Sequence, residues 1–96
     1  MKLSFHPDVK VDLRGQFEYY HEIDSELGLS FIEEYRAALA FVKSEPLAMR
    51  IFCSNDRKMP FKRFKSFALV YEVGDEEIRI KAVADLRRKP YFWLDR

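Results

Sequence analysis

The chain has few of the residues that build the commonest small functional sites. Cys53 is its one cysteine, which excludes an internal disulfide and suits a reducing compartment. The two histidines, His6 and His21, lie far apart in the sequence, and no His-x-x-His or Cys-x-x-Cys pattern accompanies them. Three isolated glycines cannot form a glycine-rich loop around a phosphate. We therefore expect neither a metal site nor a bound cofactor.

Long apolar runs are also missing. No run approaches the roughly 18 residues that a membrane span needs, and the N-terminus lacks the apolar segment of a secretory signal. The composition, 48% hydrophobic and 34% charged, is that of a globular domain without repeats or linkers. We expect one cytoplasmic domain over residues 1–96 that makes no contact with a membrane.

Charge is distributed unevenly, although the net charge is only +1. Residues 1–48 hold 5 Lys and Arg against 9 Asp and Glu, whereas residues 49–96 hold 12 against 7. The acids of the second half gather around one turn: Glu72, Asp75, Glu76 and Glu77. A basic half with an acidic tip favours contact with phosphate or with an acidic protein, the alternative being a solvated surface.

The first half of the chain predicts a strand and two helices. Residues 2–6 alternate polar and apolar, and Pro7 suits the first position of a helix. Helical spacing then continues to about residue 27 through Val9, Leu13, Phe17, Tyr20, Ile23 and Leu27. We expect Gly28 to end this helix in the left-handed conformation, and Ser30 with Glu33 to form the capping box of a second helix that runs to about Lys43. So short a connection predicts an antiparallel hairpin.

The second half predicts strands. Residues 46–56 read as a loop, residues 57–64 as a basic edge strand that contains Pro60, and residues 67–73 as a central strand. After a turn at Gly74, residues 78–85 alternate, which places Ile78, Ile80, Ala82 and Ala84 on one face. The predicted fold is α+β, in the order β-α-α-β-β-β, with the helix hairpin packed on a small antiparallel sheet.

Two basic clusters are candidates for binding an anionic target. The segment 57–65 carries Arg57, Lys58, Lys62, Arg63 and Lys65 between aromatic residues and contains no acid. Cations that alternate with aromatics suit a phosphate backbone, but lysines and a proline also protect edge strands from aggregation. The second cluster, 87–89, follows a strand directly, where guanidinium groups are well placed to bind phosphate or carboxylate. The predicted anion-binding residues are Arg57, Lys62, Arg63, Arg87 and Arg88.

Catalysis is less favoured than binding. Cleavage of RNA without a metal ion needs a base, an acid and cations around the charged transition state. The second half offers many cations but no group that titrates near neutral pH without a large shift of its pKa. The candidates for catalytic roles are Lys62, Lys65, Asp85, Arg88 and Tyr91.

The end of the sequence, "AVADLRRKPYFWLDR" (82–96), completes a pattern that resembles the RelE/ParE superfamily of bacterial type II toxins, particularly the ParE-like plasmid-stabilisation proteins. Relatives typically end in Ala-Val-x-His-x-x-Arg-x-Pro-x-Tyr-Trp-x-x-Arg. The positions that match in register are Ala82, Val83, Arg88, Pro90, Trp93 and Arg96. Asp85 stands where the family often has histidine, Phe92 where it has tyrosine, and Lys65-Ser66-Phe67 where it has Phe-Pro-Tyr. The resemblance covers essentially the whole chain.

The resemblance implies a toxin that inhibits growth. Similarity to ParE-type members implies that the chain binds DNA gyrase, and similarity to RelE-type members implies ribosome-dependent cleavage of mRNA. The loss of the histidine and the small net charge favour the ParE type. A third reading is a non-toxic relative that only binds a partner. Each toxin class implies an acidic antitoxin whose disordered segment folds onto the toxin.

The resemblance also gives an interpretation of the aromatic tail. It implies that Pro90, Phe92 and Trp93 fold back as a hydrophobic latch, which leaves Arg87 and Arg88 as the functional part. Together with the helical and strand periodicity, it predicts a largely buried core of Phe17, Tyr20, Ile32, Tyr35, Leu39, Leu69, Tyr71, Ile80 and Trp93.

Overall fold

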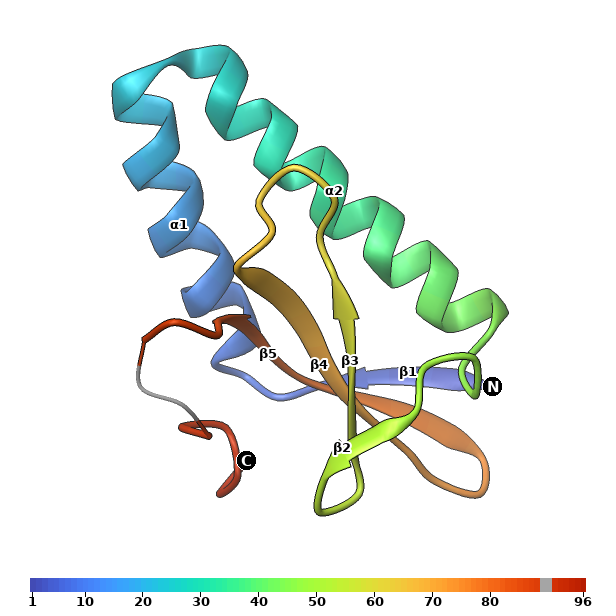
Figure 1. Cartoon of the computed structure of the whole chain (residues 1–96). Helices are drawn as coiled ribbons and strands as arrows, with labels where there is room; N and C mark the ends of the chain where they lie inside the picture. Colours follow the sequence, from blue (N-terminus) through green and yellow to red (C-terminus); the bar gives the residue numbers. More distant parts are fainter. Residues whose placement is uncertain (89–90) are drawn as a thin grey trace.

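The computed structural model describes residues 1–88 and 91–96 and has the predicted α+β architecture (Figure 1). In chain order the elements are β1 (Lys2–Phe5), α1 (Val9–Ile23), α2 (Ser25–Ser44), β2 (Ile51–Cys53), β3 (Asp56–Pro60), β4 (Phe67–Val73) and β5 (Glu77–Asp85). They form one sheet in the order β1-β5-β4-β3-β2. All neighbouring pairs are antiparallel except β1 with β5, so the sheet is mixed and not purely antiparallel as predicted. None of the described helices is both long and apolar enough to cross a membrane.

The boundary between the two helices lies four residues earlier than the glycine predicted. Asp24, in an extended conformation with φ −163°, separates the helices, and its side chain accepts a hydrogen bond of 2.8 Å from the main-chain N–H of Glu26. Asp24 therefore supplies the N-cap that we expected from Ser30. Gly28 lies inside α2, where a Cβ atom would stand 2.8 Å from the Cβ of His21. Its role is the close approach of the two helices, and its φ is not positive.

The region around the basic strand also differs from the prediction. The segment expected to be a loop contains β2. The strand predicted over residues 57–64 ends at Pro60 as β3, which leaves Lys62 and Arg63 outside it. Because β2 pairs with β3 opposite Asp56 and Arg57, β3 is not an edge strand along that stretch. Pro60 is at the end of its strand, where a missing N–H costs least.

The helices cover one face of the sheet and enclose the larger core. Leu69, Tyr71 and Ile80 are buried as predicted. Tyr20, Tyr35 and Leu39 pack against this core while partly buried, whereas Phe17 and Ile32 are only half-buried. Because α2 begins at Ser25, its inward face runs through Gly28, Phe31, Ala38 and Val42. Phe31, fully buried among the rings of Tyr20, Phe61, Phe64 and Phe67, holds the place that we predicted for Ile32.

A β-bulge in β5 divides its alternating side chains between two cores. Val70 lies opposite Ala82 and Tyr71 opposite Ile80, so Lys81 has no opposite residue. An extra residue reverses the alternation that follows it. Ile78 and Ile80 therefore face the helices, as does Val83, while Ala82 and Ala84 face the other side. The prediction that Ile78, Ile80, Ala82 and Ala84 share one face was wrong.

The tail covers the second face of the sheet. Trp93 is 1% exposed and packs with Val70, Ala82 and Ala84, with Phe52 and Leu86 at the margin. The prediction of a hydrophobic latch is thus confirmed for Trp93. Phe92 is 37% exposed, so it buries less of its side chain than Trp93 does. Pro90, the third latch residue, lies outside the described residues, as does Lys89.

Candidate functional site

Three strands place most of the predicted cations at one end of the sheet. Pro60 pairs with Ala68, and Phe67 pairs with Asp85, so the end of β3, the start of β4 and the end of β5 coincide. The segments that leave these strands carry five exposed cations, Lys62, Arg63, Lys65, Arg87 and Arg88. We call this group the basic end.

Arg57 does not belong to the basic end. It lies opposite Tyr71, on the face of the sheet that the helices cover, and donates from Nη1 to the main-chain oxygen of Met49. The hydroxyl of Tyr71 donates to the main-chain oxygen of Pro46 at 3.1 Å. These two side chains hold the loop between α2 and β2, which gives Arg57 a structural position.

Arg63 is attached to α2. Its main-chain N–H donates to both carboxylate oxygens of Glu34, at 2.9 and 3.0 Å, and its Nη1 donates to Oγ of Ser30 at 3.0 Å. The helix therefore fixes the position of the loop between β3 and β4. Ser30, which we expected to cap a helix, orients a guanidinium group instead.

Asp85 organises the two arginines at the end of β5. One carboxylate oxygen accepts from the main-chain N–H of Arg87 at 3.1 Å and from its Nε at 3.3 Å, and the other lies 3.6 Å from Nε of Arg88. Burial alone would raise the pKa of this carboxyl, but the hydrogen bonds and charge of Arg87 outweigh burial and lower the pKa below its ordinary value. Asp85 is thus a carboxylate at neutral pH and holds no proton to donate.

This arrangement predicts an acid-dependent loss of stability. A carboxyl whose folded pKa is depressed stabilises the fold above its ordinary pKa of about 3.9 and ceases to do so as the pH falls through the folded value. Asp85→Asn should therefore unfold at a lower temperature than the parent at neutral pH, and the difference should shrink as the pH falls toward about 2. Thermal unfolding of both proteins across this range measures it. A difference that is constant or grows in acid would contradict the assignment.

The candidates for catalytic roles do not form one cluster. Lys62 and Lys65 are on the loop between β3 and β4, and Asp85 and Arg88 are at the end of β5. Tyr91 lies on the tail in a left-handed conformation, with φ 65°, and its ring is 5.7 Å from that of Trp93. It lines a shallow pocket with Phe52, Lys58 and Leu86, on the face of the sheet away from the helices. Tyr91 therefore lines a different pocket from Asp85 and Arg88.

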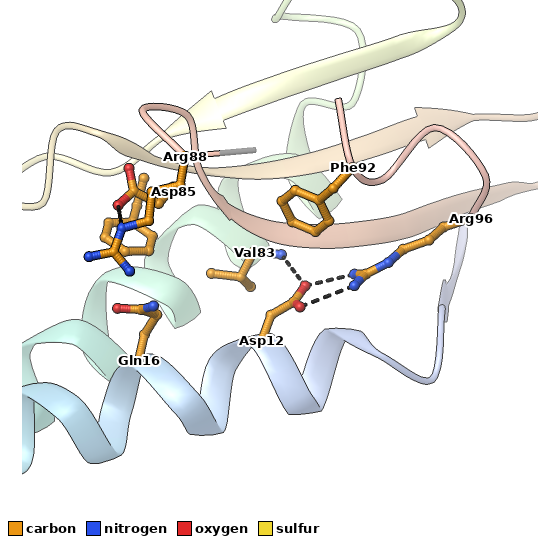
Figure 2. A pocket seen from close by; sticks show the side chains of 8 residues that line it. Asp12, Gln16, Val83, Asp85, Arg88, Phe92 and Arg96 are labelled. Atoms are coloured by element: carbon orange, nitrogen blue, oxygen red, sulfur yellow. Dashed lines mark hydrogen bonds and ion pairs between the residues drawn. The ribbon is translucent and has the colours of Figure 1, made fainter. Parts of the chain in front are cut away.

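A cavity of about 390 Å³ opens beside the basic end (Figure 2). Its walls come from α1, β4, β5 and the tail: Asp12, Gln16, Phe67, Val83, Asp85, Arg88, Phe92 and Arg96. Phe92 lies over β5, and the side chain of Gln16 lies on the same side of the cavity as Arg88 (Figure 2). An apolar floor with an amide and a guanidinium at one side can accept an apolar side chain together with an anionic group.

An ion pair between the tail and α1 closes the other side of this cavity. Arg96 donates from Nη1 and Nη2 to the two carboxylate oxygens of Asp12, at 2.7 and 3.2 Å, and also to the main-chain oxygen of Lys81 at 3.0 Å. Asp12 in turn accepts from the main-chain N–H of Val83 at 3.1 Å. Since β1 pairs with β5 only as far as Ile80, these side chains satisfy the strand edge beyond it. Asp12 was not among the site residues predicted from the sequence, because no local pattern indicates a contact with Arg96, 84 residues away.

No group of three or more His, Cys, Asp or Glu side chains that could hold a metal ion occurs in the part of the chain that the structure describes. The chemistry of the basic end and its cavity is that of guanidinium, ammonium, amide and aromatic groups, with the carboxylates of Asp12 and Asp85 paired to arginines. Such a set binds anions and apolar side chains.

Comparison with known proteins bears on the fold. No protein-family model and no curated protein matches the sequence. The structure is similar to a solved chain described as "Chromosomal ParDE TA system from P. aeruginosa", with a TM-score of 0.76 and 18% sequence identity. The likeness covers 88% of this chain and 95% of that chain. At this level of identity the likeness concerns the fold, and this chain has a ParE-like α+β fold.

Proposed function

We propose that the chain is the toxin of a type II toxin–antitoxin system and that it inhibits growth by binding DNA gyrase, as a ParE-like protein. The observation that carries this proposal is the shared fold with the ParDE chain over 88% of the sequence. The tail pattern that suggested the family supports it, because the positions of Trp93 and Arg96 serve the packing of that fold.

The arrangement of the basic end favours binding over cleavage. A metal-independent endoribonuclease of the RelE type needs an acid or base at the charged site. Arg87 lowers the pKa of Asp85, so this carboxylate holds no proton to donate and is only a weak base. Tyr91 lines a different pocket from the cavity that Asp85 lines. The remaining groups at the basic end are cations, which suit the binding of a negatively charged surface.

A groove between α2 and β3 suits the acidic segment of an antitoxin. It has a volume of about 210 Å³ and is mainly apolar, lined by Ala37, Ala38, Phe41, Met59, Pro60 and Phe61. Lys62 and Glu34 are also part of its wall. The outer edge of β3 is not paired with β2 beyond Arg57, so an extended or helical segment can approach the groove. The proposed antitoxin segment would place apolar side chains in the groove and an acidic residue beside Lys62.

Induced expression in a bacterium tests the proposal. A gyrase-binding toxin should arrest growth and change the supercoiling of a reporter plasmid while mRNA on ribosomes stays intact. Cleavage of translated mRNA with normal supercoiling would favour the RelE-type activity and contradict ours. Normal growth at the same level of soluble protein would instead favour a partner-binding protein without toxicity.

Single substitutions at the basic end are expected to weaken growth arrest without lowering the melting temperature by more than about 2 °C, since exposed ion pairs contribute little to stability. The variants are Lys62→Ala, Arg63→Ala and Arg88→Ala. Arg87→Ala should weaken growth arrest too, but it should also lower the melting temperature, because it removes side-chain hydrogen bonds that offset the burial of Asp85. Arg88→Lys should also weaken growth arrest, because an ammonium cannot form a bidentate fork. Viable counts after induction and thermal unfolding of the purified variants give the two readouts.

Arg50→Ala is the matched control, because Arg50 is an exposed cation in the loop before β2, away from the basic end. It should leave growth arrest unchanged. Full toxicity of all the basic-end variants at equal expression would show that these cations are only solvated and do not bind the target. Parallel loss of toxicity and stability in Arg88→Ala would assign Arg88 a structural role.

A further inference from the structure

The outward face of α1 carries an apolar stripe that none of the described residues covers. Val11, Tyr19 and Ile23 are 62%, 56% and 61% exposed, and Gly15 is exposed between them. These residues are spaced by four, so they follow one another along the helix from its first turn to its last. In Figure 1, α1 lies at the margin of the molecule, with α2 and the sheet on its other side. The stripe is therefore open to a partner.

Gly15 at the centre of this stripe is not required by the fold of the single chain. A Cβ atom added at Gly15 would meet nothing within 4 Å, in contrast to Gly28, where it would meet His21. Glycine in the middle of a helix is less stable than alanine. A glycine that weakens its helix and relieves no contact within the chain is explained by the close approach of something outside it.

The charges beside the stripe point to the identity of that partner. Lys10 and Arg14 lie in the first half of α1 and Glu18 and Glu22 in the second half, all exposed. The order of these four opposes the helix dipole, which favours acids near the N-terminus and bases near the C-terminus. Asp12 in the first turn accords with the dipole, but its carboxylate is bound by Arg96. Among the described ion pairs of the chain, none involves these four side chains. A second helix running in the opposite direction with the same charge order would pair base with acid along its whole length.

We propose that two copies of this chain associate through α1, with the helices antiparallel and related by a two-fold axis. In the proposed dimer Val11 lies against the partner's Ile23. The side chain of Tyr19 enters the notch, by which we mean the space left at the partner's Gly15 by its missing side chain. An antiparallel pair brings the same flank of each helix together. Arg14 then meets the partner's Glu18, and the two-fold axis repeats this pair. The stripe, the notch and the charges are all complementary to themselves in the same register.

The size of the surface sets the strength of the association. α1 has 15 residues, which is a helix about 22 Å long at 1.5 Å per residue. One pair of such helices buries less area than the roughly 1,200 Å² of a stable interface. We therefore expect a reversible dimer that is populated only at high micromolar concentration or above, independently of whether the chain is a toxin.

Sedimentation equilibrium over a concentration series, with charge-reversal variants, tests the proposal. The parent chain should dimerise, whereas Arg14→Glu and Glu18→Arg should each weaken dimerisation by about tenfold or more, since each replaces two attractive pairs by repulsive ones. An equimolar mixture of the two variants should recover the dimer, because each then offers the charge that the other lacks. Pairing within one helix cannot produce this recovery, so a mixture that stays monomeric overturns the register.

Gly15→Ala separates the interface from the fold. The added methyl group should raise the melting temperature measured at a concentration where the protein is monomeric, and it should weaken the dimer by closing the notch for the partner's Tyr19. Arg36→Ala, on an exposed face of α2, is the control and should leave dimerisation unchanged. A parent chain that remains monomeric at millimolar concentration, or an alanine variant that dimerises as well as the parent, would overturn the proposal.

Discussion

Trp93→Ala is expected to lower the free energy of unfolding by about 3–5 kcal/mol, the range for truncating a large buried aromatic side chain. Trp93 is 1% exposed, and it is the largest side chain of the core on the second face of the sheet. Its removal uncovers Val70, Ala82 and Ala84 together, because the neighbouring side chains of the tail are too exposed to fill the space. In a domain of this size the melting temperature should fall by more than about 10 °C.

Two variants serve as controls for this prediction. Trp93→Phe should lose less than half as much, because Nε1 of Trp93 donates to no atom of the described chain and phenylalanine keeps most of the apolar contact. Phe92→Ala, at a position that is 37% exposed, should also lose much less. Urea unfolding followed by circular dichroism measures all three. A Trp93→Ala variant within 1 kcal/mol of the parent, by the usual size of surface effects, would mean that the tail is not part of the core.

Apart from the short strand β2, the order of the elements could be predicted from the sequence because it rests on periodicity. Helical spacing, strand alternation and the turn at Gly74 are local signals that survive in the folded chain. The boundary between α1 and α2 was predicted less well, because the sequence offers two possible N-cap residues for the second helix, Asp24 and Ser30. Ser30 with Glu33 matches a capping box, but Asp24 caps four residues before Gly28, and helix packing at His21 accounts for the glycine.

The faces of β5 could not be predicted from local periodicity either. The alternation from Ile78 to Ala84 predicts one apolar face, but the bulge at Lys81 reverses it halfway. A bulge depends on the register with β4, which is a contact between segments that no local pattern encodes. The interpretation of the tail was better, because the resemblance of its pattern to the RelE/ParE superfamily implied a latch, and Trp93 is buried as that latch requires.

The candidate site was predictable in composition but not in arrangement. Four of the predicted anion-binding residues, Lys62, Arg63, Arg87 and Arg88, gather at the basic end. Arg57 lies on the strand itself and faces the helices, because strand parity, and not the sign of its charge, decides its face. Asp12 and Gln16 were missed as parts of the cavity, since they come from the opposite end of the sequence.

Lys81→Met is expected to destabilise the fold about as strongly as the loss of Trp93. Nζ of Lys81 donates to both carboxylate oxygens of Asp56, at 3.0 and 3.2 Å, and Asp56 is 0% exposed. Removing one partner of a buried ion pair leaves the other charge without compensation, which costs about 3–5 kcal/mol. Methionine keeps the length and apolar stem of lysine, so the loss reports the missing charge and not a cavity.

The double variant Asp56→Leu with Lys81→Met distinguishes the loss of the ion pair from the cost of leaving the Asp56 carboxylate buried without a partner. If the cost of the single variant comes from the unpaired carboxylate of Asp56, the double variant should regain most of the stability, since a buried ion pair is often no better than apolar residues of similar volume. Arg88→Met is the matched surface control, because Arg88 pairs with Asp85 while its side chain is 71% exposed, and it should lose less than about 1 kcal/mol. Urea unfolding gives all the free energies. A double variant as unstable as Lys81→Met would mean that the ion pair itself holds the bulge in β5, and that the two cores depend on it for their separation.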